Sequence, residues 1–489
     1  MVSSFDISQN NTSRQLIVIG NGFDLQCDLN SKYQDFFNYR FGILLQNQIN
    51  QRLGIKSNAE EDFAEALTRE LRPYFKITVG PKQVFRAYSW EELSSPSPNI
   101  NREKLQIVKK TKTFMENYLQ QIKDQITNQI EDEQLKKKLL IEWNIISSIN
   151  YSKWDTVFLL ANCFLSKDSI VQWNDVENII FNIVSIILID EKELSLSDLT
   201  FKPDSSERYF MFGVRNCFND DKDKAAITML DELKIFEDNF ADYINKIKKE
   251  DKNKYYHKSF DLLIALMHMY PNNIIDVLSF NYSLDKECLI DFKKYFDNKC
   301  GKQKELRVNS WSNIHGIAAY KDTHVKKNIL SQDFFPADYN VQLPGPIFGI
   351  DNHDILTPDK NGNINFDDPR SIFTKSFRLL DNHINNLRTK TFQDNVNVIT
   401  FFGHSLSQAD YSYFESIFDQ YDVFHSNVKL EFYYYSGTDD ITAKTNERET
   451  MRKVVNLLTS YGATLKNEHG ENIVNKLILE QRLNVLPNP

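Results

Sequence analysis

The stretch that most constrains the fold is residues 16–25, which read LIVIGNGFDL. Its first four residues are apolar with no polar alternation, which predicts a strand buried on both faces, as in a parallel sheet. Gly20 and Gly22 predict a tight turn whose backbone another group can approach closely. We expect Asp24 to cap a helix that continues through Phe37.

A strand, a glycine turn and a helix start together form a natural site for a nucleotide or a phosphate group. The third glycine of the dinucleotide fingerprint is replaced by Leu25, so this is not the ordinary dehydrogenase motif. The alternative is a turn needed only for strand–helix geometry. If the turn binds a nucleotide, the candidate residues are Gly20, Asn21, Gly22, Phe23 and Asp24.

Length and composition predict a globular intracellular protein with two or three structural units. The 489 residues are 41% hydrophobic and 26% charged, and a chain this long exceeds one ordinary core. The net charge of −9 argues against a surface for nonspecific nucleic-acid binding. The five cysteines form no CxxC pair, which predicts reduced thiols and a cytoplasmic location. The most apolar stretch, 179–189, is too short to span a bilayer, so no membrane association is expected.

The middle of the chain has the apolar spacing of helices. Residues 102–149 predict one long amphipathic helix or a helical pair, which either packs on its own domain or contacts a partner. Further helices are expected at 60–71, 154–164, 171–189 and 225–249. The Ser/Pro-rich segment 94–98 predicts a break before them. We therefore divide the chain into an α/β part at 1–95, a helical insertion at 96–270 and a second α/β part at 271–489.

Strand-like apolar runs return after the helical region, at 274–280, before 314–316, and at 345–351, 396–402 and 428–435. Several of these runs end in a polar residue, as does the first strand of the chain. Because ligands bind outside the carboxyl ends of strands in an open parallel sheet, these residues predict one shared site. They are Asn21, Asn281, His315 and His404.

Two of these residues are candidates for catalysis. His315 precedes Gly316 and could serve as a general base near neutral pH, or it could simply bond to a neighbouring backbone group. Asn281 could bind a ribose hydroxyl or orient a water molecule, or it could cap the turn at the end of its strand.

The segment from Gly403 to Asp410 forms a second glycine turn after a strand. The backbone N–H groups of Gly403, His404 and Ser405 could hold a phosphate. Ser405 lacks the second glycine of a hydrolase nucleophile elbow. Asp410 lies six residues after His404, so we expect it to cap a helix over 411–418. Together with Gly403, His404 and Ser405, it is also a candidate for binding the nucleotide. No spacing in the chain predicts a metal site.

These motifs, in this order, resemble the bacterial AbiH proteins of phage abortive infection over nearly the whole chain. The segments that carry the resemblance are 19–25 with Tyr33, WNDVE at 173–177, FNY at 280–282, IHG at 314–316, IFGI at 347–350, and FGHSL at 402–406 with Asp410.

The same set is similar, more remotely, to the sirtuin-like NAD-consuming fold. That resemblance implies a Rossmann-like, mostly parallel sheet with a large helical insertion. It also implies nucleotide-binding roles for the two glycine turns, and catalytic roles for Asn281 and His315. The zinc-binding cysteines of the deacetylases are missing, so deacetylation is not expected. Asp24 stands where those enzymes commonly carry a small residue, which leaves the pose of a nucleotide open.

We therefore interpret the sequence as an antiphage effector that binds NAD or a related nucleotide and hydrolyses its N-glycosidic bond without a required cofactor. The interpretation allows a phage-derived trigger and self-association through the helical insertion. A non-catalytic nucleotide sensor or partner-binding protein is an alternative of another class. A nuclease that uses clustered carboxylates is a third.

Overall fold

The computed structural model describes residues 13–71, 76–79, 84–87, 100–165, 173–188, 210, 213–214, 217–218, 222–250, 252–268, 274–285, 288–301, 307–321, 345–355, 367–381, 392, 396–437, 439–465 and 469–489. The chain forms two compact units. The sheet unit consists of Met1–Ser31, Ile244–Pro346 and Leu379–Pro489. The helical unit consists of Lys32–Tyr243 and Ile347–Arg378.

The sheet unit is built on a six-stranded sheet in which every pairing is parallel. Its order is β5-β4-β1-β6-β7-β8. Numbered along the chain within this sheet, that is 3-2-1-4-5-6, the order of doubly wound dinucleotide-binding folds. The predicted α/β class with a parallel sheet is confirmed. The strands are β1 (Arg14–Ile19), β4 (Ile274–Ser279), β5 (Arg307–Asn313), β6 (Val398–Phe402), β7 (Lys429–Tyr434) and β8 (Leu483–Pro487).

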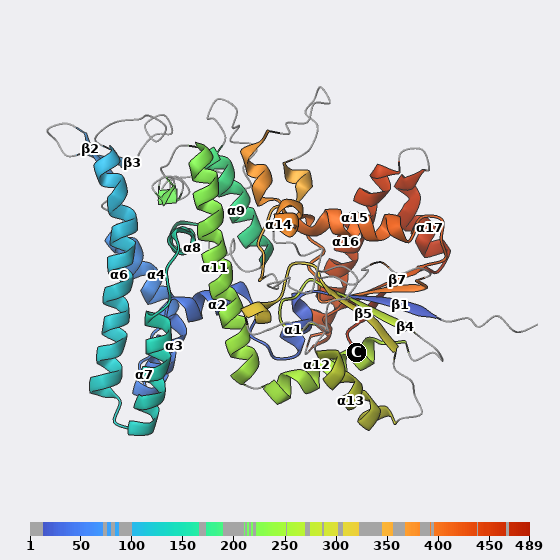
Figure 1. Cartoon of the computed structure of the whole chain (residues 1–489), viewed down its shortest axis with the longest axis horizontal. Helices are drawn as coiled ribbons and strands as arrows, with labels where there is room; N and C mark the ends of the chain where they lie inside the picture. Colours follow the sequence, from blue (N-terminus) through green and yellow to red (C-terminus); the bar gives the residue numbers. More distant parts are fainter. Residues whose placement is uncertain are drawn as a thin grey trace, which may run out of the picture. The chain divides into compact units, whose positions relative to one another are not determined.

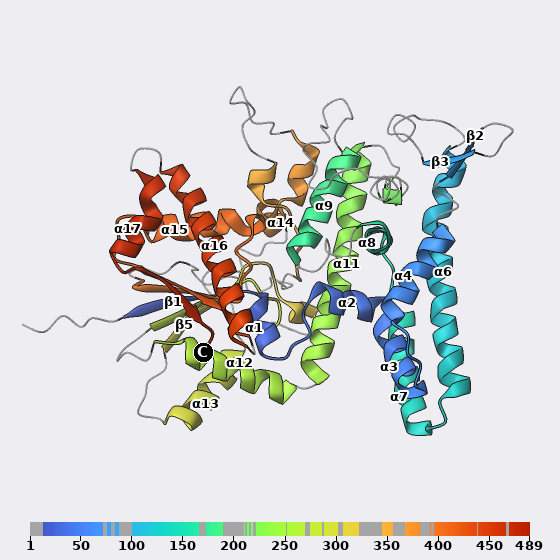
Figure 2. The ribbon, with the colours of Figure 1, turned by 180° about the vertical axis from the view of Figure 1, so that it is seen from behind.

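Each face of this sheet has its own apolar core, because side chains alternate along a strand. Leu16 and Val18 belong to the core covered by α15 (Tyr411–Gln420), α16 (Asp440–Thr464) and α17 (Ile473–Leu479). Ile17 and Ile19 belong to the core covered by α1 (Asn21–Gln26), α12 (Lys252–Leu266) and α13 (Cys288–Cys300). Figures 1 and 2 show α15 and α17 on one side of the strands and α12 and α13 on the other. Burial on both faces explains the uninterrupted apolar runs.

The helical unit contains α2 (Tyr33–Arg40), α3 (Ile43–Leu53), α4 (Ala59–Leu71), α6 (Ile100–Gln129), α7 (Glu133–Ser147), α8 (Lys153–Phe164) and α9 (Trp173–Leu188). It also holds most of α11 (Lys222–Glu250), the first residues of α14 (Lys375–Asp381), and an antiparallel pair, β2 (Lys76–Val79) with β3 (Val84–Ala87). The helices predicted at 60–71, 154–164, 171–189 and 225–249 are confirmed.

Region 102–149 forms a helical pair, α6 and α7, whose apolar side packs within its own unit. Ile122 and Ile126 of α6 are fully buried. The indole N–H of Trp143 in α7 donates to the Leu119 carbonyl at 2.7 Å. This packing accounts for the amphipathic pattern without a partner, and self-association stays a prediction.

Two predicted elements are wrong. Asp24 does not cap a helix: α1 begins after Gly20, ends at Gln26, and is separate from α2. The run 345–351 is not a strand, because Ile350 makes only an isolated bridge with Thr374. There the amide N–H of Phe348 donates to a buried glutamate in place of a neighbouring strand.

The two units do not coincide with the three spans expected from the sequence. The helices in 32–71 pack in the helical unit, and α12 packs in the sheet unit. The break expected at 94–98 lies outside the described residues.

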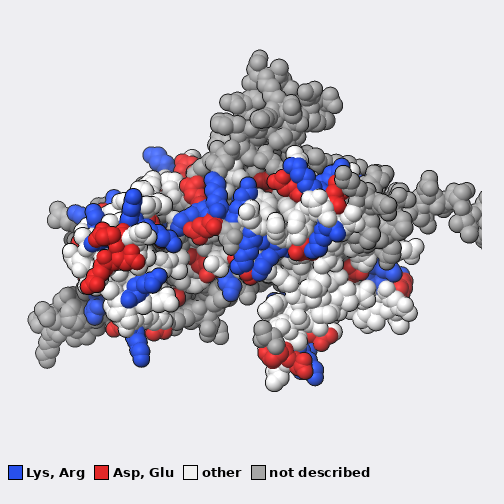
Figure 3. Space-filling model, turned by 90° about the horizontal axis from the view of Figure 1, so that it is seen from below, with Lys and Arg blue, Asp and Glu red and all other residues white. Residues whose placement is uncertain are grey.

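The distribution of charged side chains on the surface and the apolarity of the helices both agree with the composition of the chain. Acidic and basic side chains are interspersed on the face seen in Figure 3, in keeping with the modest net charge. Among the described helices, none combines the length and apolarity needed to cross a membrane.

Candidate functional site

The candidate site lies in the sheet unit at the carboxyl ends of β1 and β6. These two strands are neighbours, and the strand order reverses between them, since β4 and β5 extend the sheet on one side and β7 and β8 on the other. Open α/β sheets bind ligands at such a switch point. The turn 20–22 follows β1 and the turn 403–405 follows β6, so the two glycine turns meet here.

The two turns pack backbone against backbone. Gly20 N–H donates to the Phe402 carbonyl at 2.9 Å, and Gly22 N–H donates to the Gly403 carbonyl at 2.7 Å. A Cβ atom on Gly22 would lie 2.6 Å from Gly403 Cα, and one on Gly403 would lie 2.4 Å from the Phe23 nitrogen. Gly403 also has a φ of +67°. These glycines are required by the close contact of the turns, whatever ligand the turns bind.

Asn281 joins the end of β4 to the first glycine turn. Its side-chain amide donates to the Gly20 carbonyl at 2.9 Å, and its own carbonyl accepts from the Asn313 side chain at 2.9 Å. Asn281 is buried, with 5% of its surface exposed. It therefore stabilises the first glycine turn, and its side chain bonds there rather than capping the turn at the end of its own strand.

Asp24 lies in α1, directly after the first glycine turn, and belongs to a buried polar cluster that was not predicted from the sequence. Its carboxylate accepts hydrogen bonds from the Tyr255 hydroxyl at 2.7 Å and from the Ser283 hydroxyl at 2.8 and 2.7 Å. Burial raises the pKa of Asp24 to about 6, although these bonds and the charge of Lys248 act in the opposite direction. Lys248 donates to the Ser283 carbonyl at 2.9 Å, and burial lowers its pKa.

The two histidines at the strand ends both face Asp410. His404 Nε2 lies 3.4 Å from Asp410 Oδ2, and His315 Nε2 lies 3.8 Å from Asp410 Oδ1. All three side chains are largely buried, with exposed fractions of 4%, 5% and 12% for His404, His315 and Asp410. Asp410 holds the N-cap position of α15, as predicted, but its side chain makes no capping bond. The strand ends thus predicted that the two histidines would lie together, whereas the position of the Asp410 carboxylate between them was not predicted.

Aromatic rings surround the two imidazoles. The Phe280 ring lies edge-on to both, with centroids 4.4 Å from His404 and 5.5 Å from His315. The ring of Tyr413 lies 5.3 Å from His315, and that of Phe414 lies 4.9 Å from His404. These contacts fix the planes of the imidazoles and make their surroundings largely apolar.

The remaining predicted site residues, Phe23, Asn21 and Ser405, lie in or beside the two glycine turns. Phe23 is buried against Phe402, with ring centroids 6.1 Å apart. Asn21 accepts a hydrogen bond from the Ser31 hydroxyl at 2.6 Å. Ser405 is half-buried in the second turn. The residues that the structure describes contain no group of three His, Cys, Asp or Glu side chains able to hold a metal ion.

Comparison with known proteins identifies the family. The family model for bacteriophage abortive infection AbiH matches residues 16–434, from β1 to the end of β7, and so includes both glycine turns and the histidine–aspartate group. No curated protein and no solved structure matches the chain. The match spans most of the chain and supports a role in phage abortive infection. The chain therefore belongs to the AbiH family of bacteriophage abortive infection proteins.

Proposed function

We propose that this AbiH protein acts in phage defence by binding NAD or a related nucleotide at the switch point and hydrolysing its N-glycosidic bond. The observation that carries the proposal is the meeting of His315, Asp410 and His404 at the carboxyl ends of the strands. Acid–base groups in a largely apolar setting at this place in a doubly wound sheet suit a nucleotide hydrolase.

The reaction needs few groups. Breaking the bond between nicotinamide and ribose releases neutral nicotinamide and leaves an oxocarbenium-like ribose, which water attacks. His315 accepts the proton of that water as it adds, and the proton is later released to solvent. The products are nicotinamide, ADP-ribose and one proton. Asn281 supports the ribose side of the site through the Gly20 turn.

The nucleotide phosphates are assigned to the second turn. In the first turn, the N–H groups of Gly20, Gly22 and Phe23 already donate to backbone carbonyls. These bonds hold the first turn in place. The segment Gly403–Ser405, which packs against the first turn, is therefore the better candidate for binding phosphates.

The test is NAD consumption by the purified full chain, with nicotinamide and ADP-ribose quantified. It is run with and without a divalent metal, and with extract from infected cells as an activator. We expect metal-independent turnover that falls by about 100-fold or more in His315→Ala, the range typical of a lost general base. Asn281→Ala is measured beside it, with thermal unfolding to separate lost folding from lost chemistry.

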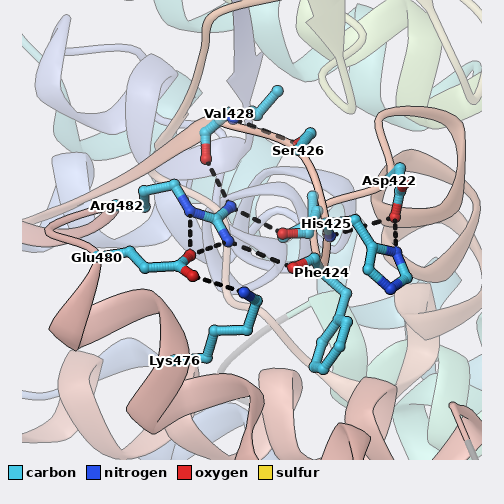
Figure 4. Close-up of polar contacts among 9 residues, drawn as sticks. Asp422, Phe424, His425, Ser426, Val428, Lys476, Glu480 and Arg482 are labelled. Carbon is cyan, nitrogen blue, oxygen red and sulfur yellow. Dashed lines mark hydrogen bonds and ion pairs between the residues drawn. The ribbon is translucent and has the colours of Figure 1, made fainter. Parts of the chain in front are cut away.

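A matched control is available in the same unit. His425 also contacts an aspartate, Asp422, with Nδ1 2.8 Å from Oδ1, but it lies in the exposed connection after α15 (Figure 4). His425→Ala should keep the rate of the unmodified chain. Equal turnover in His315→Ala and His425→Ala would contradict the proposed role of His315.

A nucleotide sensor without chemistry is the second candidate. It is favoured by one observation: Asn281 and three N–H groups of the first turn are engaged in bonds within the protein. Tight NAD binding with no product under any condition would select the sensor over the hydrolase.

A further inference from the structure

We infer that the side chains of His404 and Asp410 form a relay with that of His315 and act on it, rather than binding a nucleotide themselves. In this relay the Nε2–H of a neutral His404 faces Asp410, and the negative charge of Asp410 increases the basicity of His315. The part of the inference that concerns catalysis rests on the proposed hydrolysis, but the arrangement of the relay does not.

The protonation of His404 follows from its backbone contact. The Leu406 N–H donates to His404 Nδ1 at 3.0 Å. An atom that accepts this bond carries a lone pair and no proton, so the proton of the neutral ring lies on Nε2. Nε2 is the atom that faces Asp410 Oδ2, at 3.4 Å. His404 therefore presents an N–H group to the carboxylate.

The backbone at the residue that donates this bond is held in an unusual conformation. Leu406 has a φ of +54°, in the left-handed region that costs a leucine about 1 kcal/mol. Its N–H is the donor to the imidazole two residues earlier. Such strain persists where the surrounding structure requires it and often marks a functional site.

Asp410 occupies the N-cap position of α15, but its side chain accepts no hydrogen bond from the first N–H groups of that helix. Aspartate at an N-cap normally accepts hydrogen bonds from the first N–H groups of the helix. Here its two oxygens face one imidazole each, Oδ2 toward His404 and Oδ1 toward His315. The donor on His404 stabilises the ionised carboxylate, and the carboxylate stabilises a protonated His315.

The environment of His315 includes several titratable groups. Asp410 faces it from the start of α15, Tyr413 contacts it from the first turn of that helix, and His404 acts on it through Asp410. Phe280, from the end of β4, adds no charge. Of these groups, Asp410 is the one expected to carry a charge at neutral pH, so it should dominate the proton affinity of His315.

The test is nitrogen NMR of the full chain labelled at histidine, titrated from pH 5 to 9. We expect His404 to show a protonated Nε2 and an unprotonated Nδ1 at neutral pH. In Asp410→Asn, the midpoint for protonation of His315 should fall by about one pH unit, because the neighbouring negative charge is removed. A His404 ring protonated on Nδ1, or a His315 midpoint unchanged in Asp410→Asn, would overturn the relay.

Two further variants keep the test decisive if Asp410→Asn folds poorly. His404→Gln can retain a donor toward Asp410, whereas His404→Phe keeps the ring without any donor. We expect the His315 midpoint to stay near its original value in His404→Gln and to move in His404→Phe. Asp422→Asn, which removes the partner of His425, is the control and should leave His315 unchanged.

The chemistry is tested separately. If the chain hydrolyses NAD, the acid limb of the pH–rate profile should move to lower pH by the same amount in Asp410→Asn. The expected NMR result with no turnover would remove the proposed substrate and retain the relay. Turnover with an unchanged acid limb in Asp410→Asn would retain the hydrolase and remove the relay.

Discussion

The buried carboxylate of Asp24 should make the stability of the sheet unit depend on pH in a direction opposite to that of most aspartates. Burial raises its pKa from 3.8 to about 6 in the folded chain. A group with a raised folded pKa contributes stability that is fully present below pH 3.8 and is lost as the pH rises through about 6. The difference between the two pKa values corresponds to about 3 kcal/mol.

Asp24→Asn isolates this contribution. An asparagine keeps the shape of the side chain and can still accept from Tyr255 and bond to Ser283, but it does not ionise. The stability of the variant relative to the unmodified chain should therefore increase with pH, by up to about 3 kcal/mol between pH 4 and 7.5. Contributions from groups that do not interact with Asp24 cancel in this difference.

The assay is urea unfolding of both chains at half-unit steps of pH. The control is Asp439→Asn, at the exposed N-cap of α16, where hydrogen bonds from Thr442 and Ile441 lower the pKa. That lowered pKa gives stability that is fully present above pH 3.8, so the control difference should be flat from about pH 5 upward. An Asp24→Asn difference that is equally flat between pH 4 and 7.5 would refute the reasoning.

Three substitutions test other parts of the structure by thermal or urea unfolding. Gly403→Ala should destabilise by several kcal/mol because its Cβ would meet backbone at 2.4 Å, whereas Gly54→Ala, with a similar φ of +68° and open space around it, should cost about 1 kcal/mol. Equal losses would contradict the packing of the two turns. In the helical unit, Arg378→Met should cost about 3–5 kcal/mol because the buried Glu237 loses its two bonds at 2.7 and 3.0 Å, and adding Glu237→Gln should restore part of that loss. Arg482→Ala should cost about 2–3 kcal/mol, because its guanidinium binds three backbone carbonyls after α15 (Figure 4); a loss below 1 kcal/mol would show that water replaces it.

The sheet was predictable because its strands are buried on both faces. The runs 16–19, 274–280 and 398–402 consist mainly of apolar residues, and each is followed by a glycine or asparagine at a turn. Strand β8 was not predicted, because its residues are only half-buried at the edge of the sheet and lack that pattern. The run 345–351 shows the opposite error, since a short apolar stretch that contains glycine and proline also suits a buried loop.

The location of the site could be predicted from the sequence, but the contacts of its residues could not. Strand ends in a parallel sheet meet at one edge, so Asn281, His315 and His404 were expected together, and they lie there. The contacts that define their roles depend on residues far apart in the chain. Asp24 bonds to Tyr255, 231 positions later, and no local pattern marks that pair.

The proposed function requires that a nucleotide binds at the switch point between β1 and β6. The most direct measurement is photoaffinity labelling of the full chain with an azido derivative of NAD, with the adduct mapped by mass spectrometry and competed by free NAD. We expect labelling in residues 20–24 or 403–410 that free NAD prevents. Competable labelling confined to the helical unit, or no competable labelling at all, would contradict it.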